Sequence, residues 1–178
     1  MKLLIPDAIL ESVFTIDLAK LKRRQLKGLL VDIDNTIVPW GQPHIEEAFV
    51  HWVQHAKEQG FKVCLVSNAK RQRTQVFADL LDIPAVGQAL KPLNRAFRRG
   101  MKLLNLSPTE VAVIGDQLFT DVFGGNRLGL YTILINPLST TELGATKIMR
   151  QLERKAFAKM VERGHIKAES MRIRQGRD

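Results

Sequence analysis

The sequence predicts an α/β fold, a doubly wound parallel sheet without a large cap domain. Short, nearly continuous apolar runs rich in Val, Leu and Ile alternate with longer stretches of helical spacing. This is the pattern of buried parallel strands joined by crossover helices, which cover both faces of the sheet. The length of 178 residues fits one compact core that needs no disulfide or structural metal.

Five apolar runs are predicted to form strands. Four of them are continuous and strongly apolar: residues 28–33, 61–66, 111–115 and 131–135. A weaker fifth strand is predicted at 83–86, where the apolar run is short. Runs of four to eight apolar residues between polar segments favour buried strands.

Helices are predicted between these strands. The first covers 44–59 and ends at a glycine, and the second covers 70–81. The third covers 92–104, with Pro92 suited to its first turn. A fourth helix is expected to follow Asp121.

The chain divides into two parts by composition. Residues 1–140 are predicted to form the α/β domain, including the amino-terminal segment, and 141–178 a basic extension. From Thr141 to about Arg163, apolar residues recur at roughly helical intervals among many charges, which predicts one or two amphipathic helices. The charge density beyond them favours a frayed tail.

The formal net charge of +9 is concentrated at the two ends of the chain. Residues 1–28 carry six basic and three acidic groups, residues 147–178 carry ten and four, and the segment between them is neutral. Three meanings remain open for these basic ends: nucleic-acid binding, attraction to an anionic membrane surface, or simple solvation.

We expect a cytoplasmic protein. No run approaches the ~18 uninterrupted apolar residues of a membrane span, and Pro6, Asp7 and Glu11 interrupt the amino-terminal apolar stretch before a signal peptide can form. The single cysteine, Cys64, excludes an internal disulfide and a cysteine-based zinc site.

Polar residues follow the predicted strands at the points where these strands end. In a parallel sheet, ligands bind beyond the carboxyl ends of the strands, so we expect these residues to meet in one crevice. The set contains four carboxylates, one hydroxyl, one amide and one ammonium, which is too polar for a packing role. Its members are Asp32, Asp34, Ser67, Asn68, Lys91, Asp116 and Asp121.

These residues resemble the four motifs of the haloacid dehalogenase (HAD) superfamily of phosphatases. DIDNT resembles the first motif, Ser67 the second, Lys91 the third, and GDQLFTD the fourth, in that order along the chain. The longer segments LLVDIDNTIVPW, CLVSNAKRQR, ALKP and VIGDQLFTDVFGGNRLG are similar to the YqeG family of subclass IIIA, which is related to the mitochondrial phosphatidylglycerophosphate phosphatases. The resemblance extends from about Leu4 to Pro137 and implies a Rossmann-like HAD core.

The resemblance implies a role for each residue that handles phosphate. Asp32 is the implied nucleophile, which forms an aspartyl-phosphate, and Asp34 the general acid and base. Lys91 neutralises charge on the transferring group, and Ser67 with the backbone around Asn68 binds its oxygens at a helix start, where the dipole favours anions.

The resemblance also implies a Mg²⁺ cofactor. Mg²⁺ prefers oxygen ligands in octahedral geometry and retains several waters, so few carboxylates suffice to hold it. The implied ligands are the side chains of Asp32 and Asp116 and the carbonyl of Asp34, with Asp121 supporting the site.

The expected function is a Mg²⁺-dependent phosphomonoester phosphatase, with phosphatidylglycerophosphate as the implied substrate. No cap domain fits between residues 36 and 60 or between 68 and 91, which leaves an open site suited to a bulky substrate or a lipid headgroup. The cationic ends would then hold the enzyme peripherally at the inner membrane surface.

Two alternatives remain open. The first is a nucleotide or nucleic-acid-end phosphatase, although only Phe157 places an aromatic ring within the basic extension, which offers little for base stacking. The second is a non-catalytic adaptor that binds RNA or a ribosome-associated partner through this extension. The intact motifs argue against a loss of activity.

Overall fold

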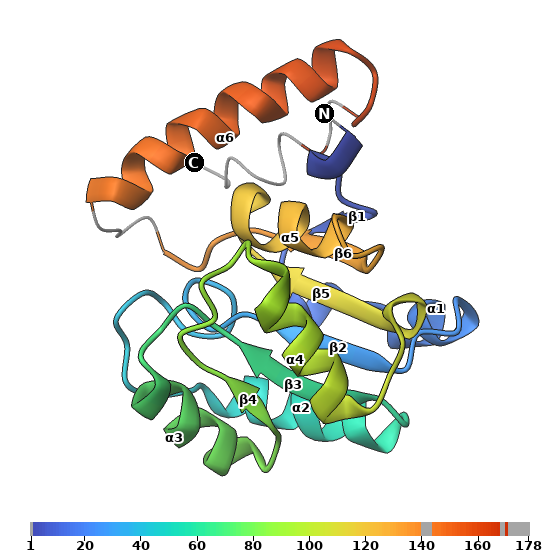
Figure 1. Cartoon of the computed structure of the whole chain (residues 1–178), viewed down its shortest axis with the longest axis vertical. Helices are drawn as coiled ribbons and strands as arrows, with labels where there is room; N and C mark the ends of the chain where they lie inside the picture. Colours follow the sequence, from blue (N-terminus) through green and yellow to red (C-terminus); the bar gives the residue numbers. More distant parts are fainter. Residues whose placement is uncertain (1, 140–143, 168–169, 171–178) are drawn as a thin grey trace.

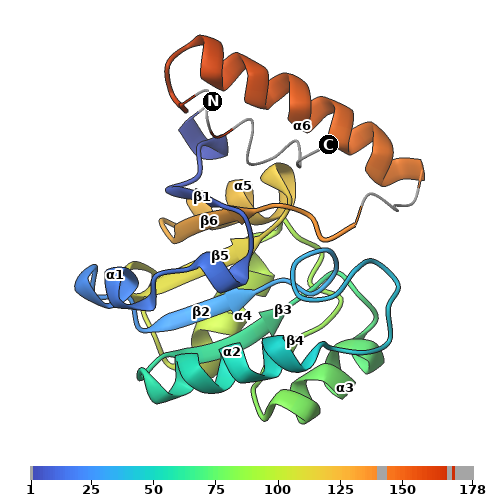
Figure 2. The ribbon, with the colours of Figure 1, turned by 180° about the vertical axis from the view of Figure 1, so that it is seen from behind.

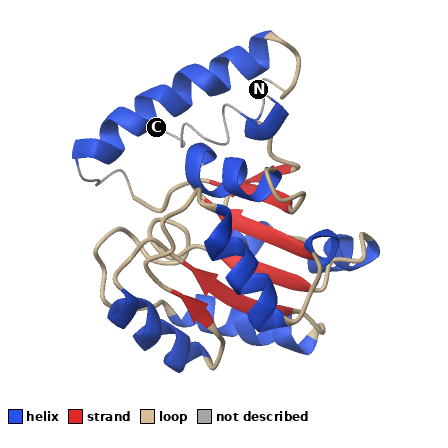
Figure 3. Cartoon of the chain, viewed as in Figure 1, coloured by secondary structure: helices blue, strands red, loops and turns tan. Residues whose placement is uncertain are grey.

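The computed structural model describes residues 2–139, 144–167 and 170. Within them, six parallel strands form one sheet in the order β1-β6-β5-β2-β3-β4 (Figures 1 and 3). The strands are β1 (Ala8–Leu10), β2 (Gly28–Val31), β3 (Lys62–Val66), β4 (Ala85–Val86), β5 (Val111–Gly115) and β6 (Tyr131–Ile135). The predicted doubly wound parallel sheet is confirmed.

Helices cover both faces of the sheet. Helices α1 (Leu18–Arg23) and α2 (Glu47–Glu58) lie on the face seen in Figure 2, and α4 (Asn94–Leu104) and α5 (Phe123–Asn126) on the face seen in Figure 1. Helix α3 (Arg71–Leu81) lies beside β4 at the sheet edge. Because both faces are covered, β2 is buried along its whole length, which explains its continuous apolar sequence.

Each face has its own apolar core. On the α2 side, Phe49 and Val53 pack with Leu29 of β2 in one buried cluster. On the α4 side, Phe97 and Leu30 belong to a second cluster. Successive residues of β2 therefore point to opposite faces, as the pleat of a strand requires.

All five predicted strands are confirmed, with small changes at their ends. The first predicted strand ends at Val31 rather than at residue 33, because the chain turns at Asp34, and Asn35 has a left-handed φ of 60°. The weak strand is only two residues long, Ala85–Val86. Strand β1 and helix α1 were not predicted. Strand β1 extends the sheet beyond β6, and α1 adds to the helices that cover the face shown in Figure 2.

The helix expected after Asp121 is confirmed as α5, which begins at Phe123. A π-helical turn, η4 (Leu118–Val122), precedes α5 and contains Asp121. The Asp121 carboxylate accepts a hydrogen bond from the backbone N–H of Gln117 at 3.2 Å, which stabilises the start of the turn at Leu118, three residues before Asp121. Short 3-10 turns complete the described elements: η1 (Lys2–Leu4), η2 (Val13–Thr15) and η3 (Pro108–Glu110).

The carboxyl-terminal helix is continuous. Helix α6 (Gly144–Glu162) lies along one end of the molecule, beside η1 and α5 (Figures 1 and 2). Its side chains Phe157 and Met160 are buried in a third cluster with Leu118, Val122 and Leu134. Residues 141–143 of the predicted helical stretch, and residues 168–169 and 171–178 of the predicted tail, lie outside the described residues. Among the described helices, none combines the length and apolar character needed to cross a bilayer.

Candidate active site

The candidate site lies where the direction of chain winding reverses. From β2 the chain proceeds to β3 and β4 on one side of the sheet, and then returns to β5 and β6 on the other. Asp32 follows β2 and Asp116 follows β5, its neighbour in the sheet. Such a switch point opens a crevice at the carboxyl ends of the strands.

A buried ammonium group lies between two carboxylates of the site. Lys91 Nζ donates to Asp32 Oδ1 at 2.7 Å and to Asp121 Oδ1 at 2.6 Å. The side chains of Lys91, Asp32 and Asp121 are at most 8% exposed. These three residues, widely separated in the sequence, are therefore brought together as predicted.

A third carboxylate completes a compact acidic cluster. Asp116 is fully buried, and oxygen atoms of Asp32, Asp116 and Asp121 lie within 4.8 Å of one another. Carboxylate oxygens are the ligands that Mg²⁺ prefers, and two or three of them suffice when water completes the octahedron. The cluster therefore fits the donor set expected for Mg²⁺.

Burial raises the pKa of two of these acids. Desolvation is the main cause for Asp32, whose pKa rises to about 6, with Lys91 opposing the rise and Asp121 adding to it. Desolvation also raises the pKa of Asp116 to about 7, against the lowering effect of Arg150. Burial opposes the charged form of Lys91, but Asp121 and Asp32 raise its pKa well above the usual range. Lys91 is therefore a fixed positive charge.

Asp34 lies at the site but has a different partner. Its two carboxylate oxygens accept hydrogen bonds from Arg73 Nη1 at 2.8 and 3.0 Å. Arg73, in the first turn of α3, also donates to the carbonyl of Gln42 at 3.0 Å. Asp34 is partly exposed and lies outside the group of three carboxylates. Its carboxylate is thus separate from the buried cluster, at a more accessible position.

Ser67 and Asn68 connect the loop after β3 with the loop that carries Lys91. Ser67 is buried and continues the sheet ladder, since its N–H donates to the carbonyl of Val86 at 3.0 Å. Its hydroxyl accepts from the N–H of Ala69 at 3.1 Å. The side-chain oxygen of Asn68 accepts from the backbone N–H of Lys91 at 2.7 Å. The amide of Asn68 therefore holds Lys91 in place.

Gly115 is required by the close packing of Asp121. A Cβ atom at position 115 would lie 2.2 Å from Cγ of Asp121. The glycine that precedes Asp116 therefore leaves the space in which the Asp121 carboxylate reaches the cluster.

Three charged residues at the site were not predicted: Arg73, Arg150 and Glu153. Arg150 donates to the carboxylate of Asp116 and to its backbone carbonyl, and Glu153 is buried beside it.

A signal for Arg150 and Glu153 was present in the sequence. Glu153 and Phe157 are four residues apart on one predicted helix, so an acid lies on its apolar face. Arg73 has no comparable signal, because no local pattern distinguishes it from the neighbouring basic residue Arg71.

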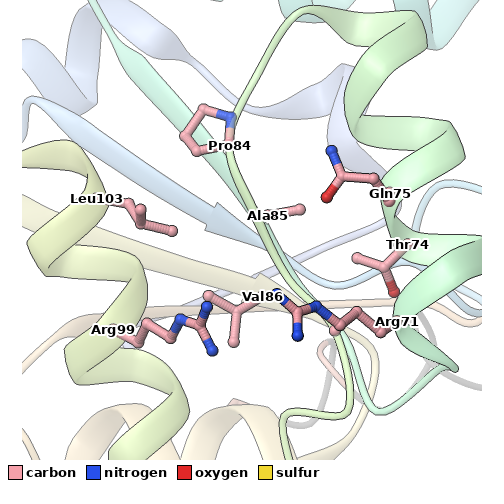
Figure 4. Close-up of a pocket in the computed structure, with 9 residues that line it drawn as sticks. Arg71, Thr74, Gln75, Pro84, Ala85, Val86, Arg99 and Leu103 are labelled. Carbon is pink, nitrogen blue, oxygen red and sulfur yellow. The ribbon is translucent and has the colours of Figure 1, made fainter.

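A separate hollow lies between α3 and α4 beside the edge strand β4 (Figure 4). It has a volume of about 240 Å³, and Arg71 and Arg99 extend into it from the two helices, across Val86. None of the predicted site residues lines it.

Comparisons with known proteins identify relatives of this chain among phosphatases. The family model described as haloacid dehalogenase-like hydrolase matches residues 42–129. The "Probable phosphatase YqeG" of Bacillus subtilis is 39% identical over 168 residues, which cover 94% of this chain and 98% of the relative. The cobalt-bound deoxy-D-mannose-octulosonate 8-phosphate phosphatase of Haemophilus influenzae has a similar fold, with a TM-score of 0.52, 17% identity, and coverage of 63% of this chain and 69% of that one.

Two more distant relatives are named for a lipid substrate. "Phosphatidylglycerophosphate phosphatase 1, chloroplastic/mitochondrial" of Arabidopsis thaliana is 25% identical, over 86% of this chain and 46% of the relative. "Phosphatidylglycerophosphatase GEP4, mitochondrial" of Saccharomyces cerevisiae is 28% identical, over 66% of this chain and 75% of the relative. Because the similarity to the Bacillus phosphatase extends over almost the whole of both chains, this chain belongs to the haloacid dehalogenase-like hydrolases and, within them, to the YqeG phosphatases.

Proposed function

We propose that the protein is a Mg²⁺-dependent phosphomonoesterase that acts through an aspartyl-phosphate on Asp32. The observation that carries this proposal is the buried cluster in which Lys91 contacts Asp32 and Asp121, with Asp116 alongside. It combines a carboxylate nucleophile, a fixed positive charge and oxygen ligands for a cation, which is what phosphoryl transfer needs.

The proposed reaction has two displacements at phosphorus. In the first, a carboxylate oxygen of Asp32 bonds to phosphorus while the bond to the substrate's alcohol oxygen breaks, and Asp34 donates a proton to that oxygen. In the second, Asp34 takes a proton from a water whose oxygen bonds to phosphorus, and the bond to Asp32 breaks. Inorganic phosphate leaves, and Asp32 and Asp34 return to their starting states.

The other site residues hold the transferring group. Lys91 would offset negative charge on the phosphoryl oxygens, and Ser67 with the backbone N–H groups around Asn68 would bind them. Asp32, Asp116, Asp121 and the carbonyl of Asp34 would hold Mg²⁺. When bound, the cation supplies further charge neutralisation at phosphorus.

We further propose a lipid phosphate monoester, phosphatidylglycerophosphate, as the substrate. The names of the plant and yeast relatives support this choice. The site also lacks a covering domain, since the described chain has only α2 between β2 and β3 and only α3 between β3 and β4. An open site admits a headgroup that remains attached to a membrane.

Peripheral contact with an anionic membrane on the cytoplasmic side is part of this proposal. Large apolar side chains are exposed on the loops that follow β2, β4 and β6: Trp40 is 40% exposed, Leu90 68%, Leu93 54% and Leu138 43%. Leu90 and Leu93 flank Lys91 in the sequence. Exposed Trp and Leu beside a catalytic site suit insertion into a lipid–water interface.

The test is phosphate release by the purified protein, with Mg²⁺ or with a chelator. The substrates are phosphatidylglycerophosphate, a sugar phosphate, a nucleotide and a 3′-phosphorylated oligonucleotide, each with wild type and Asp32→Asn. We expect Mg²⁺-dependent release from the lipid and loss of release in the variant. Undiminished activity of Asp32→Asn would exclude the aspartyl-phosphate, and a preference for the nucleotide or oligonucleotide would replace the lipid as substrate.

A further inference from the structure

Helix α6 brings two charged side chains to the acidic cluster from outside the segment that matches the family model. The model match ends at residue 129, whereas α6 begins at Gly144. Arg150, Glu153, Phe157 and Met160 follow each other at intervals of three or four residues, so they lie on one face of the helix. Phe157 and Met160 anchor this face in the apolar cluster around Leu118.

Glu153 binds the backbone directly after Asp116. Its side chain is only 2% exposed, and Oε1 accepts hydrogen bonds from the N–H groups of Leu118 at 2.6 Å and of Phe119 at 3.4 Å. These two N–H groups belong to the start of η4, the turn that contains Asp121. A buried carboxylate that binds backbone N–H groups at a helical start fixes the position of that start.

Arg150 binds Asp116 itself. Its Nη1 donates to the backbone carbonyl of Asp116 at 2.8 Å and to Glu153 Oε2 at 3.0 Å, and its Nη2 donates to the Asp116 carboxylate. The planar guanidinium thus binds both the backbone carbonyl and the carboxylate of Asp116, and it also binds the carboxylate of Glu153 on the same helix as Arg150. Such a fork restricts both the direction of the Asp116 carboxylate and the path of its backbone.

We propose that Arg150 and Glu153, here called the α6 clasp, are positioning residues for the cation site. Asp116 is held by Arg150, and the turn that carries Asp121 is held by Glu153, so both acids meet Asp32 in the geometry that a divalent cation needs. This inference rests on the proposed function for the identity of the cation. Buried charges cost free energy unless they are paired. Because the apolar packing of Phe157 and Met160 would by itself dock the helix, the buried pair of Arg150 and Glu153 indicates a role beyond docking.

The test is Mn²⁺ binding, measured by the loss of the free-ion electron paramagnetic resonance signal. We compare wild type with Arg150→Met, Arg150→Lys and Glu153→Ala, and with Arg154→Met as a control, because Arg154 lies on the same helix but is exposed. Groups that orient metal ligands typically contribute 10- to 100-fold to affinity, so we expect about that loss for R150M and E153A. R150K, which retains one donor group, should recover part of it, and R154M should bind as wild type does.

The sign of the R150M effect separates positioning from simple electrostatics. Removal of a positive charge beside a cation site would by itself tighten Mn²⁺ binding. Weaker binding in R150M than in wild type and R154M, measured at a temperature where all three are folded, supports the clasp. Equal or tighter binding in R150M overturns it.

The measurement also separates the clasp from the proposed phosphatase chemistry. If wild type binds Mn²⁺ but hydrolyses no phosphomonoester, the proposed function fails. The Mn²⁺ affinity of R150M, compared with that of wild type, still decides the clasp. If wild type binds no Mn²⁺, there is no cation site for α6 to position, and the clasp is overturned.

Discussion

Buried carboxylates are costly side chains, and Asp32 and Asp116 are among the most buried acids of the described chain. Lys91 and Arg150 offset part of the cost, yet the pKa values of Asp32 and Asp116 remain raised to about 6 and about 7. Without a cation, each acid therefore retains its proton at a pH where an exposed aspartate has lost it. Because metal ligands must be ionised, a bound cation competes with these protons.

The raised pKa values predict that the metal-free protein becomes less stable as the pH rises. The folded pKa of each acid lies above its unfolded value of 3.8, so between these values the folded state holds more protons than the unfolded state. The free energy of unfolding of the metal-free protein then falls as the pH rises from about 4, and the fall ends only when the pH has passed through the folded pKa of Asp116, about 7. Thermal unfolding in a chelator should show this fall, and saturating Mg²⁺ should largely remove it.

Asp116→Asn is the control for this prediction. The amide does not titrate, so the fall of stability between pH 6 and 8 should be smaller in the variant. A metal-free wild type that becomes more stable from pH 5 to pH 8 would contradict the assignment of raised pKa values to these acids.

Gly115 allows a second prediction at a single position. In Gly115→Ala, the added methyl would overlap the Asp121 carboxylate, which lies 2.2 Å from the position of the new Cβ. Overpacking of this kind typically costs about 1–3 kcal/mol in the free energy of unfolding. Denaturant unfolding measures the change. In an Asp121→Ala background the clash is partly relieved, so the cost of G115A should shrink; equal costs in both backgrounds would contradict the packing argument.

Site residues differ in how far they could be predicted from the sequence. Asp32, Ser67 and Asp116 directly follow apolar runs, and the geometry of a parallel sheet alone brings such positions to one edge. Asp34 also follows a strand, but its pairing with Arg73 depends on where the first turn of α3 lies. Arg150 reaches Asp116 from 34 residues away, through helix docking that no local pattern specifies.

Secondary-structure elements show the same division between local and distant causes. The long buried strands and the helices between them were predictable because each has its own apolar periodicity. Strand β1 has only three residues, all partly exposed, and pairs in parallel with β6, more than 120 residues later in the chain. Neither its length nor its burial gives a periodic signal. Helix α1, with six residues and three of them basic, is equally weak as a pattern.

Hydrogen bonds of Asn68 connect two loops at the candidate site, which predicts that its replacement lowers both stability and activity. Its side chain joins the loop after β3 to the loop after β4 through the backbone of Lys91. Asn68→Ala leaves the Lys91 N–H without this acceptor, which should cost about 1–3 kcal/mol in the free energy of unfolding. It should also lower kcat for a phosphomonoester, because Lys91 loses its support. Gln72→Ala, at an exposed position on α3, is the matched control. A fully active and stable Asn68→Ala would show that Lys91 is held by Asp32 and Asp121 alone.

Basic side chains are also concentrated at one place within the central segment, although the net charge of that segment is zero. The neutral central segment contains a stretch without acids, residues 83–109, and the acids of this segment include the four of the site. Helix α4 lies within that stretch and exposes four basic side chains, those of Arg95, Arg98, Arg99 and Lys102. It follows the loop with the exposed Leu90 and Leu93. A cationic surface therefore adjoins the candidate site, in addition to the basic ends.

This arrangement makes the proposed membrane contact testable at the level of the whole protein. Each basic side chain near an anionic bilayer contributes about 1 kcal/mol, so Arg95→Gln with Arg98→Gln should weaken binding to vesicles rich in phosphatidylglycerol by roughly 30-fold at low salt. Neither residue belongs to the catalytic site, so hydrolysis of a soluble phosphomonoester should be unchanged.

The matched control is Lys20→Gln with Lys22→Gln, which removes the same charge from α1, near the opposite ends of the strands (Figure 1). If α4 faces the membrane, vesicle flotation should be reduced in the α4 variant and nearly unchanged in the α1 variant. Equal reductions would instead indicate that net charge, without orientation, governs the attraction. Binding of wild type to vesicles of neutral phosphatidylcholine as strong as to anionic ones would contradict an electrostatic contact altogether, because α4 would then have no charge to meet.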